Sequence, residues 1–188
     1  MPSEAIQNQL VAEIVSLSMR DGMTGLFNHR HFMEVLKKEA ARAMRYDRSL
    51  CLIMMDVDHF KQFNDVYGHK VGDQVLRTIA SRLANITGGA KTFRYGGEEF
   101  AIILPETEMK GVVVLAERLR KQIEAMLLDV DGEKVAVTAS FGVTIWEHGK
   151  ADTDKTRIIN AADKALYQSK RKERNTISFI GLSAVTVK

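Results

Sequence analysis

Hydrophobic residues along the chain fall into two kinds of pattern, one typical of helices and one of strands. Apolar residues at three- and four-residue steps predict amphipathic helices, and short apolar runs bounded by turn residues predict strands. The expected helices are 4–19, 29–45, 68–85, 109–127 and 156–172, with a shorter helical turn at 60–64. The expected strands are 50–57, 91–95, 99–104, 135–145 and 176–180.

The order of these elements indicates an α/β sandwich. The run 50–57 is apolar on both faces, as expected for a central strand that is covered on each side. The next two strands flank Gly96 and Gly97, which is typical of a hairpin with a tight turn. Hairpin-joined strands mixed with long helices favour a largely antiparallel sheet covered by helices.

Length and composition predict one compact domain preceded by a helix. The chain has 188 residues, 45% of them hydrophobic, and only two prolines. That is enough for a single core and too little for a second full domain. We therefore expect a linker or signalling helix within residues 1–20 and one domain over 21–182.

Charge and cysteine content narrow the class of protein. The net charge of +3 suits a phosphate-bearing small ligand and is too balanced for a dedicated nucleic-acid-binding surface. Cys51 is the single cysteine and lies in an apolar run, which predicts a buried thiol and a reducing compartment. No apolar stretch reaches the roughly 20 residues of a membrane helix, and the N-terminus does not resemble a signal peptide. These features predict a cytoplasmic location and no membrane segment.

Acidic residues follow the predicted central strand. Asp56 and Asp58 are two positions apart, which in a strand places them on one face, about 7 Å apart. Carboxylates so placed favour a hard cation such as Mg²⁺, which needs only one or two protein carboxylates. The alternative is that Asp58 simply caps a following helical turn.

A second acidic pair follows the glycines of the predicted hairpin. Glu98 and Glu99 come directly after Gly96 and Gly97, where the lack of side chains allows a ligand to approach the backbone closely. Because neighbouring strand residues face opposite ways, the two glutamates are expected to serve different roles. The alternative is an ordinary solvated hairpin turn.

Two polar clusters are candidates for nucleotide recognition. An amide and a carboxylate such as Asn64 and Asp73 can together match the hydrogen-bonding edge of guanine. The local alternative is a turn-forming Asn and a first-turn helix charge. Cations crowd the end of the last long helix, where they complement the helix dipole or bind phosphate oxygens: Lys170, Arg171, Lys172 and Arg174.

Four ordered segments together resemble the GGDEF family of diguanylate cyclases. They are Asp21–Asn28 (DGMTGLFN), Asp56–Asp73 (DVDHFKQFNDVYGHKVGD), Arg94–Phe100 (RYGGEEF) and Ala162–Tyr167 (ADKALY). The resemblance runs from about Asp21 to Ile180. It implies a fold related to adenylyl cyclase and polymerase palm domains, with a central five-stranded, mostly antiparallel sheet surrounded by helices.

The resemblance also implies residue roles. The implied metal ligands are Asp56, the carbonyl of Val57, Glu98 and Glu99, with both glutamates catalytic and Glu98 the candidate base. Asn64 and Asp73 correspond to guanine-reading positions. The remaining implied nucleotide contacts are Phe60 and Lys61 at the phosphate loop, His69 beside the nucleotide, Gly96 and Gly97 against it, and Lys170 and Arg174 on the triphosphate.

The activity implied is the condensation of two GTP molecules into cyclic di-GMP, with two Mg²⁺ or Mn²⁺ ions per active site. Because one domain presents one GTP, two chains are expected to meet as a homodimer. Family members often receive a dimerising or signalling module through an N-terminal helix, so an upstream sensory domain is a possible partner. A simple packed linker is the alternative for helix 4–19, since two heptads are too short for a stable coiled coil.

Three departures from the family pattern stand out. Thr87–Ala90 replaces the Arg-x-x-Asp of the family's inhibitory site, which predicts weak or absent product inhibition there. Glu173 replaces a common glycine, and His29 replaces a common arginine. Two rival functions remain at this point: a degenerate domain that only binds GTP or cyclic di-GMP, and a different nucleotidyl cyclase or polymerase-like enzyme.

Overall fold

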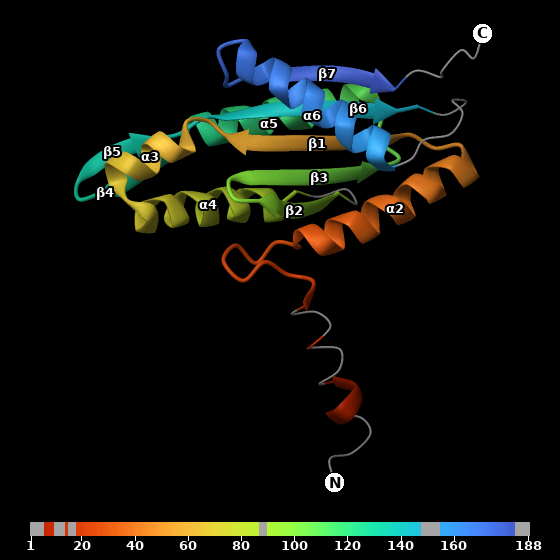
Figure 1. Cartoon of the computed structure of the whole chain (residues 1–188), viewed down its shortest axis with the longest axis horizontal. Helices are drawn as coiled ribbons and strands as arrows, with labels where there is room; N and C mark the ends of the chain where they lie inside the picture. The colour runs from red at the N-terminus through yellow and green to blue at the C-terminus, as the bar shows by residue number, and fades with distance from the viewer. Residues whose placement is uncertain (1–5, 10–13, 15–17, 87–89, 148–154, 183–188) are drawn as a thin grey trace.

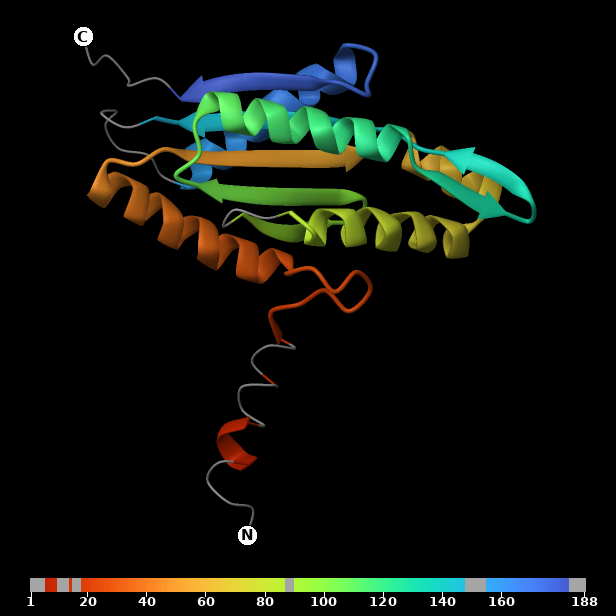
Figure 2. The same ribbon diagram turned by 180° about the vertical axis from the view of Figure 1, so that it is seen from behind.

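The structure is a computed structural model that describes residues 6–9, 14, 18–86, 90–147 and 155–182. Figure 1 shows a single twisted sheet with helices on both of its faces, and Figure 2 shows the same arrangement from behind. The helices are α2 (His29–Tyr46), α3 (Phe60–Tyr67), α4 (His69–Ala84), α5 (Met109–Glu124) and α6 (Lys155–Arg171). The strands are β1 (Leu50–Val57), β2 (Lys91–Gly96), β3 (Glu99–Pro105), β4 (Leu127–Val130), β5 (Glu133–Ala136), β6 (Ala139–Trp146) and β7 (Ile177–Leu182).

The main sheet has five strands in the order β2-β3-β1-β6-β7. All neighbouring pairs are antiparallel except β6 and β7, which run parallel. Strand β1 lies in the middle, and all eight of its residues are buried. The expected fold, an α/β sandwich around a mostly antiparallel five-stranded sheet, is confirmed.

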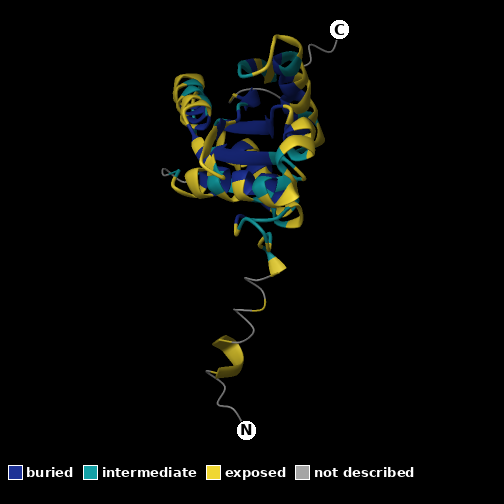
Figure 3. Ribbon diagram, turned by 90° about the vertical axis from the view of Figure 1, so that its left-hand side faces the viewer, coloured by how far each residue is buried: buried dark blue, intermediate teal, exposed yellow. Residues whose placement is uncertain are grey.

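The two-residue period of β1 divides its side chains between two cores. Figure 3 shows the buried strands of the sheet lying between more exposed helices. Cys51, Ile53, Met55 and Val57 belong to the core shared with α4 and α5. The intervening Leu50, Leu52 and Met54 belong to the core shared with α2 and α6. The next residue in this second phase is Asp56, so a carboxylate occupies the α6 side of the sheet where the apolar series ends.

Cys51 is fully buried, as predicted for a structural thiol. Its Sγ lies 3.1 Å from the carbonyl oxygen of Thr107, to which it donates. Burial, with a smaller contribution from the negative charge of Glu147, raises the pKa of the thiol to about 12. Cys51 is therefore a packing residue rather than a nucleophile.

The expected single strand over 135–145 is wrong, because part of it belongs to a second, small sheet. That region is two strands, because β5 turns away to pair with β4 in a separate hairpin, and the preceding helix ends at Glu124 rather than near 127. The hairpin turn is formed by Asp131 and Gly132, which have φ values of 52° and 87°. Asp-Gly at such a turn is a strong hairpin signal that the hydrophobic pattern alone does not reveal.

Helix α3 is longer than the expected single turn at 60–64. It continues to Tyr67, and Gly68, with φ of 84°, separates it from α4. Phe60 and Phe63 are buried and stack with ring centroids 6.3 Å apart, which secures the helix against the core.

The expected N-terminal helix is described only at residues 6–9, 14 and 18, which are helical. Residues 10–13 and 15–17 lie outside the described part of the chain. The division into a helix over 1–20 and a domain over 21–182 therefore stays a prediction. No helix of the described ranges combines the length and apolar character needed to cross a bilayer.

Helix α6 packs unusually close to β6, and Gly142 makes this possible. A Cβ built at Gly142 would collide with backbone atoms of α6, including the Cα of Leu166 at 2.7 Å. The Ser169 hydroxyl donates to the carbonyl of Phe141 at 2.6 Å, which fixes the helix along the strand. This contact sets the height of α6 above the sheet, and with it the position of every side chain that α6 sends towards β1.

We expect Gly142→Ala to destabilise the protein by about 1–3 kcal/mol, because rigid backbone rather than a flexible side chain must move. Urea unfolding measures the loss. Gly181→Ala on neighbouring β7 is the matched control, since a Cβ there meets nothing within 4 Å. Equal stability of the two variants would contradict the proposed close packing.

Candidate functional site

Two acidic residues from different strands face each other on the α6 side of the sheet. Asp56 of β1 and Glu99 of β3 are direct Cα partners in the antiparallel pair. Such partners carry their Cβ atoms about 4.5–5.5 Å apart. Both follow the same alternation as the core residues beneath α2 and α6, so the convergence of acidic side chains expected from the sequence is confirmed.

Helix α6 supplies the positive charge of this cluster. The Nζ of Lys170 lies 2.8 Å from Oδ2 of Asp56. Figure 1 shows that the C-terminal end of α6, the end of β1 and the β2–β3 turn lie at the same end of the sheet. The sequence placed Lys170 in a cation-rich helix end, and the structure brings it directly onto the acidic strand.

Burial and like charges raise the pKa of both carboxyl groups. For Asp56 the largest cause is burial; Lys170 partly offsets it, and the negative charge of Glu98 adds to it. For Glu99, burial again raises the pKa most, followed by the negative charge of Asp56. The cluster thus holds more negative charge than its surroundings stabilise, and it favours a bound cation.

Asp163 is a member of the cluster that sequence reasoning did not assign. It raises the pKa of both Glu99 and Tyr95 through its charge, and burial raises its own pKa. Asp163 lies seven residues before Lys170 on α6, which is two helical turns along the same face. That spacing is a sequence signal that could have identified it.

The glycine turn of the β2–β3 hairpin is held from two sides. The backbone N–H of Val57 donates to the carbonyl of Glu98 at 3.3 Å. The Arg94 guanidinium donates to the carbonyl of Gly97 at 2.9 Å and to both carboxylate oxygens of Asp21 at 3.1 Å. Burial opposes ionisation of Asp21, but hydrogen bonds from Thr24 and Arg94 outweigh it and lower the pKa of that carboxyl.

Helices α3 and α4 bring Asn64 against Gly72. The Oδ1 atom of Asn64 is buried and has no hydrogen-bond partner among the described residues. A Cβ built at Gly72 would collide with this oxygen, so only glycine leaves room for the amide in its present orientation. A buried acceptor without a partner is costly, which indicates that a ligand donor completes it.

The other expected nucleotide contacts lie around these helices. Asp73 follows Gly72 on α4 and is half-buried, while Lys61 and His69 are exposed at the starts of α3 and α4. Phe60 is buried and lies beneath Gly72, where a built Cβ would meet its Cζ at 3.1 Å. Phe60 therefore packs under the expected phosphate loop, and its ring has no exposed face that could contact a ligand.

Asp58 lies just beyond the end of β1 but stays on the same side of the sheet as Asp56, because Ser140, the Cα partner of Asp56, donates to it. The alternative expectation, that Asp58 caps α3, is wrong, since the N-cap residue of α3 is His59. The Asp58 oxygens instead accept from the hydroxyls of Thr138 and Ser140, each at 2.7 Å, and from the backbone N–H of Asn175 at 3.0 Å. The carboxylate is buried and engaged within the protein.

The remaining donor set fits a magnesium-like ion that is shared with a ligand. No three His, Cys, Asp or Glu side chains of the described residues are gathered so as to hold a metal by themselves. Mg²⁺ does not require this, since it binds through one or two carboxylates together with water and substrate phosphates. Asp56 and Glu99, whose pKa values are raised mainly by burial, are hard oxygen donors of that kind.

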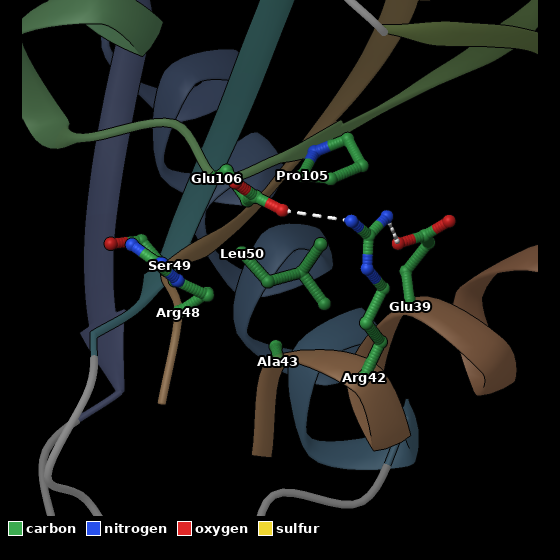
Figure 4. A pocket seen from close by; sticks show the side chains of 8 residues that line it. All are labelled: Glu39, Arg42, Ala43, Arg48, Ser49, Leu50, Pro105 and Glu106. Atoms are coloured by element: carbon green, nitrogen blue, oxygen red, sulfur yellow. Dashed lines mark hydrogen bonds and ion pairs between the residues drawn. The ribbon is translucent and has the colours of Figure 1, made fainter. Parts of the chain in front are cut away.

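A small pocket at the opposite end of the sheet is lined by structural ion pairs and is not a candidate nucleotide site. Figure 4 shows Arg42 between Glu39 and Glu106, beside Leu50 and Pro105. The guanidinium lies 3.0 Å from Glu106 and 3.7 Å from the nearly buried Glu39. The enclosed volume is about 10 Å³, room for a single water and no nucleotide.

The family model described as "Diguanylate cyclase, GGDEF domain" matches residues 18–176. The chain belongs to the GGDEF family. The resemblance carried by the four sequence segments is thereby confirmed.

Known GGDEF proteins agree in sequence and in fold. Diguanylate cyclase DosC of Escherichia coli (strain K12) is 36% identical over 159 residues, which cover 84% of this chain and 34% of DosC. The GGDEF domain of DgcB from Caulobacter crescentus, solved in complex with c-di-GMP, superposes with a TM-score of 0.81 at 35% identity, covering 86% of this chain and 93% of that one. The active GGEEF domain of a Vibrio cholerae diguanylate cyclase gives 0.75 at 33% identity, covering 83% and 98%.

The chain spans only about a third of the length of DosC. Its own activity and partners are therefore matters for proposal, as are the individual residue roles. The predicted lack of an inhibitory site falls on Thr87–Ala90, of which residues 87–89 lie outside the described part of this GGDEF chain, so it too stays a prediction.

We expect Glu99→Gln to raise the melting temperature of the metal-free GGDEF domain at neutral pH. A raised carboxyl pKa in the folded state means that stability falls as pH rises through the range between the unfolded and folded pKa values. The amide removes this cost, and because Glu99 is partly solvent-screened the gain should be about 1–3 °C.

Thermal unfolding in EDTA measures this effect, and the advantage of Glu99→Gln should shrink as the pH is lowered towards about 4. The exposed Glu133→Gln on β5 is the control and should melt with the parent protein. A lower melting temperature for Glu99→Gln at pH 7 would show that the carboxylate is not destabilised in the folded state.

Proposed function

We propose that this GGDEF chain is a diguanylate cyclase that joins two GTP molecules into cyclic di-GMP and releases two pyrophosphates. The observation that carries the proposal is the pairing of the buried Asp56 with the partly buried Glu99, which are Cα partners beside a glycine turn, with Lys170 on Asp56. Burial raises the pKa of both carboxyl groups, and perturbed carboxyl groups gathered at one place are typical of catalytic sites.

Guanine is read by Asn64 and Asp73. The partnerless Oδ1 of Asn64 accepts a hydrogen bond from the base, and the Asp73 carboxylate accepts from the adjacent N–H groups of the same edge. Adenine lacks that pair of donors. Gly72 keeps the Asn64 amide in place, because any larger residue would displace it.

A second group of residues contacts the phosphates. Lys170 and Arg174 bind triphosphate oxygens, and Lys61 and Phe60 form the phosphate loop. His69 lies beside the nucleotide. Gly96 and Gly97 let the hairpin backbone lie against the ligand, since a Cβ at either position would hold it away. In the structure, the ammonium group of Lys170 already pairs with a negatively charged oxygen, that of the Asp56 carboxylate.

Two Mg²⁺ or Mn²⁺ ions, held by Asp56, the Val57 carbonyl, Glu98 and Glu99, would stabilise charge on the reacting phosphate and on the departing pyrophosphate. Glu98 accepts the proton of the attacking 3′-hydroxyl. That hydroxyl, from one GTP, attacks the α-phosphate of the other. Two such bonds close the ring.

One domain presents one GTP, so two copies must meet with their glycine turns opposed. This makes the homodimer the active form and the monomer inactive. A regulatory module acting through the N-terminal segment would control how often two domains meet. The crystal structure of SiaD with its activator SiaC, from a protein 36% identical to this chain, supports regulation by a partner.

Incubation of the chain with GTP and Mg²⁺ or Mn²⁺ tests the proposal. We expect cyclic di-GMP to form at a rate per protomer that rises with protein concentration, because encounter of two domains is required. Glu98→Gln should lower turnover at least a hundredfold while the melting temperature is retained. A protein that binds GTP and leaves it unconverted at every concentration would be a binding module.

Base selectivity is a separate prediction. Asn64→Ala and Asp73→Ala should each reduce the preference for GTP over ATP by about tenfold, the loss of one or two hydrogen bonds to the base. Competition binding measures this preference. Gly72→Ala should have the same effect through the displaced amide, whereas Gly22→Ala, where a Cβ meets nothing within 4 Å, should leave selectivity unchanged. Undiminished discrimination in Asn64→Ala would exclude its role as a guanine reader.

A further inference from the structure

Asp58 is a buried carboxylate that the proposed chemistry leaves unused. It follows Asp56, the proposed metal ligand, by two positions, and its carboxylate oxygens accept hydrogen bonds from within the protein. Oδ1 accepts from Ser140, and Oδ2 accepts from Thr138 and from the backbone N–H of Asn175. The bond to Asn175 spans the largest separation along the chain, 117 residues, and joins the end of β1 to the turn between α6 and β7.

That turn has an unusual backbone. Glu173, Arg174 and Asn175 have φ values of 71°, 63° and 43°, so three consecutive residues with side chains occupy the left-handed region. Residues other than glycine rarely adopt this conformation, and consecutive instances persist only where surrounding contacts hold them. The family's common glycine at position 173 is replaced here by Glu173, which increases the need for such contacts.

Asn175 is where those contacts meet. Its backbone N–H donates to Asp58, its Oδ1 accepts from Arg120 at 3.0 Å, and its Nδ2 donates to Glu124 at 2.7 Å. Arg120 is itself held by Glu117 and Glu124 on α5. The turn is thus fastened to β1 on one side and to the end of α5 on the other.

Arg174 lies inside this fastened turn. Its backbone N–H donates to the carbonyl of Ser169 at 3.2 Å, and its side chain is exposed. With the Cα fixed between Ser169 and Asn175, the turn sets the direction in which the Arg174 side chain leaves the backbone. Release of the Asp58 bond would free Glu173 and Arg174 to return to ordinary backbone conformations and would turn the side chain away.

We propose that Asp58 is a positioning residue that locks the Glu173–Asn175 turn and thereby aims Arg174 at the triphosphate of the nucleotide. The inference rests on the proposed role of Arg174 in binding GTP. One three-residue segment, Asp56–Asp58, then serves both ends of the phosphate site: Asp56 on the metal side and Asp58, through Asn175, on the arginine side.

Binding of two ligands in the presence of Mg²⁺ separates this role from general stabilisation. The analogue 3′-deoxy-GTP carries the triphosphate but cannot be cyclised, and guanosine carries the base and ribose without any phosphate. We expect Asp58→Ala to weaken 3′-deoxy-GTP about tenfold, the loss of one charge-assisted contact, and to change guanosine binding less than twofold. Arg174→Ala should give the same pattern, and the double variant should bind no more weakly than Arg174→Ala alone.

Three further variants complete the test. Asp58→Ser is smaller than Asp58 but can still hydrogen-bond the Ser140 hydroxyl; it loses the reach to the Asn175 N–H, so it should weaken 3′-deoxy-GTP selectively even if Asp58→Ala folds poorly. Asp58→Asn should restore most of the affinity, because its oxygen can still accept from Asn175 while its amide donates to the Ser140 hydroxyl. Thr138→Val is the matched control: it removes a donor to Asp58 without touching the turn and should bind both ligands like the parent.

The binding results separate the phosphate role of Arg174 from the positioning role of Asp58. If Arg174→Ala weakens 3′-deoxy-GTP but Asp58→Ala and Asp58→Ser do not, the positioning role is wrong and the phosphate role of Arg174 stands. If Arg174→Ala has no effect on 3′-deoxy-GTP, both the phosphate role and the positioning role are wrong. Additive losses in the Asp58→Ala, Arg174→Ala double variant, or equal losses for guanosine, would likewise overturn the positioning role.

Discussion

The burial of negative charge at the end of the central strand is the constraint around which this end of the molecule is organised. Asp56 continues the apolar series of β1 into a position where burial penalises its charge, and Glu99 of β3 lies directly opposite. Such an arrangement is unfavourable unless positive charge is brought to it. Lys170 provides one charge from α6, and the proposed metal ions would supply the rest.

Delivery of that charge depends on the packing of α6 on β6. The absence of a side chain at Gly142 lets the helix backbone lie directly on the strand, and Ser169 fixes its position along the strand axis. Lys170 is the next residue after Ser169. A contact between backbones, remote from any ligand, therefore determines whether an ammonium group reaches Asp56.

The sequence predicted most of the fold, because the order of helices and strands depends on local periodicity. The acidic centre came from the motif resemblance, since alternation within a strand does not fix the register that pairs Asp56 with Glu99. The partners of Asp58 could not be predicted because they lie 80, 82 and 117 residues away in the chain. Asp163 and the β4–β5 hairpin were missed although each has a local signal, the seven-residue spacing to Lys170 and the Asp131–Gly132 pair.

The burial of Cys51 has a practical consequence for observing how two copies approach each other. With its sulfur enclosed and its pKa near 12, the native thiol is shielded from maleimides and spin labels at neutral pH. Because it is the sole cysteine, one introduced at an exposed position away from the proposed site, such as Glu133, would react alone, without prior removal of the native residue from the core. Distances between attached probes could then report encounter of the protomers in solution on an otherwise unaltered chain.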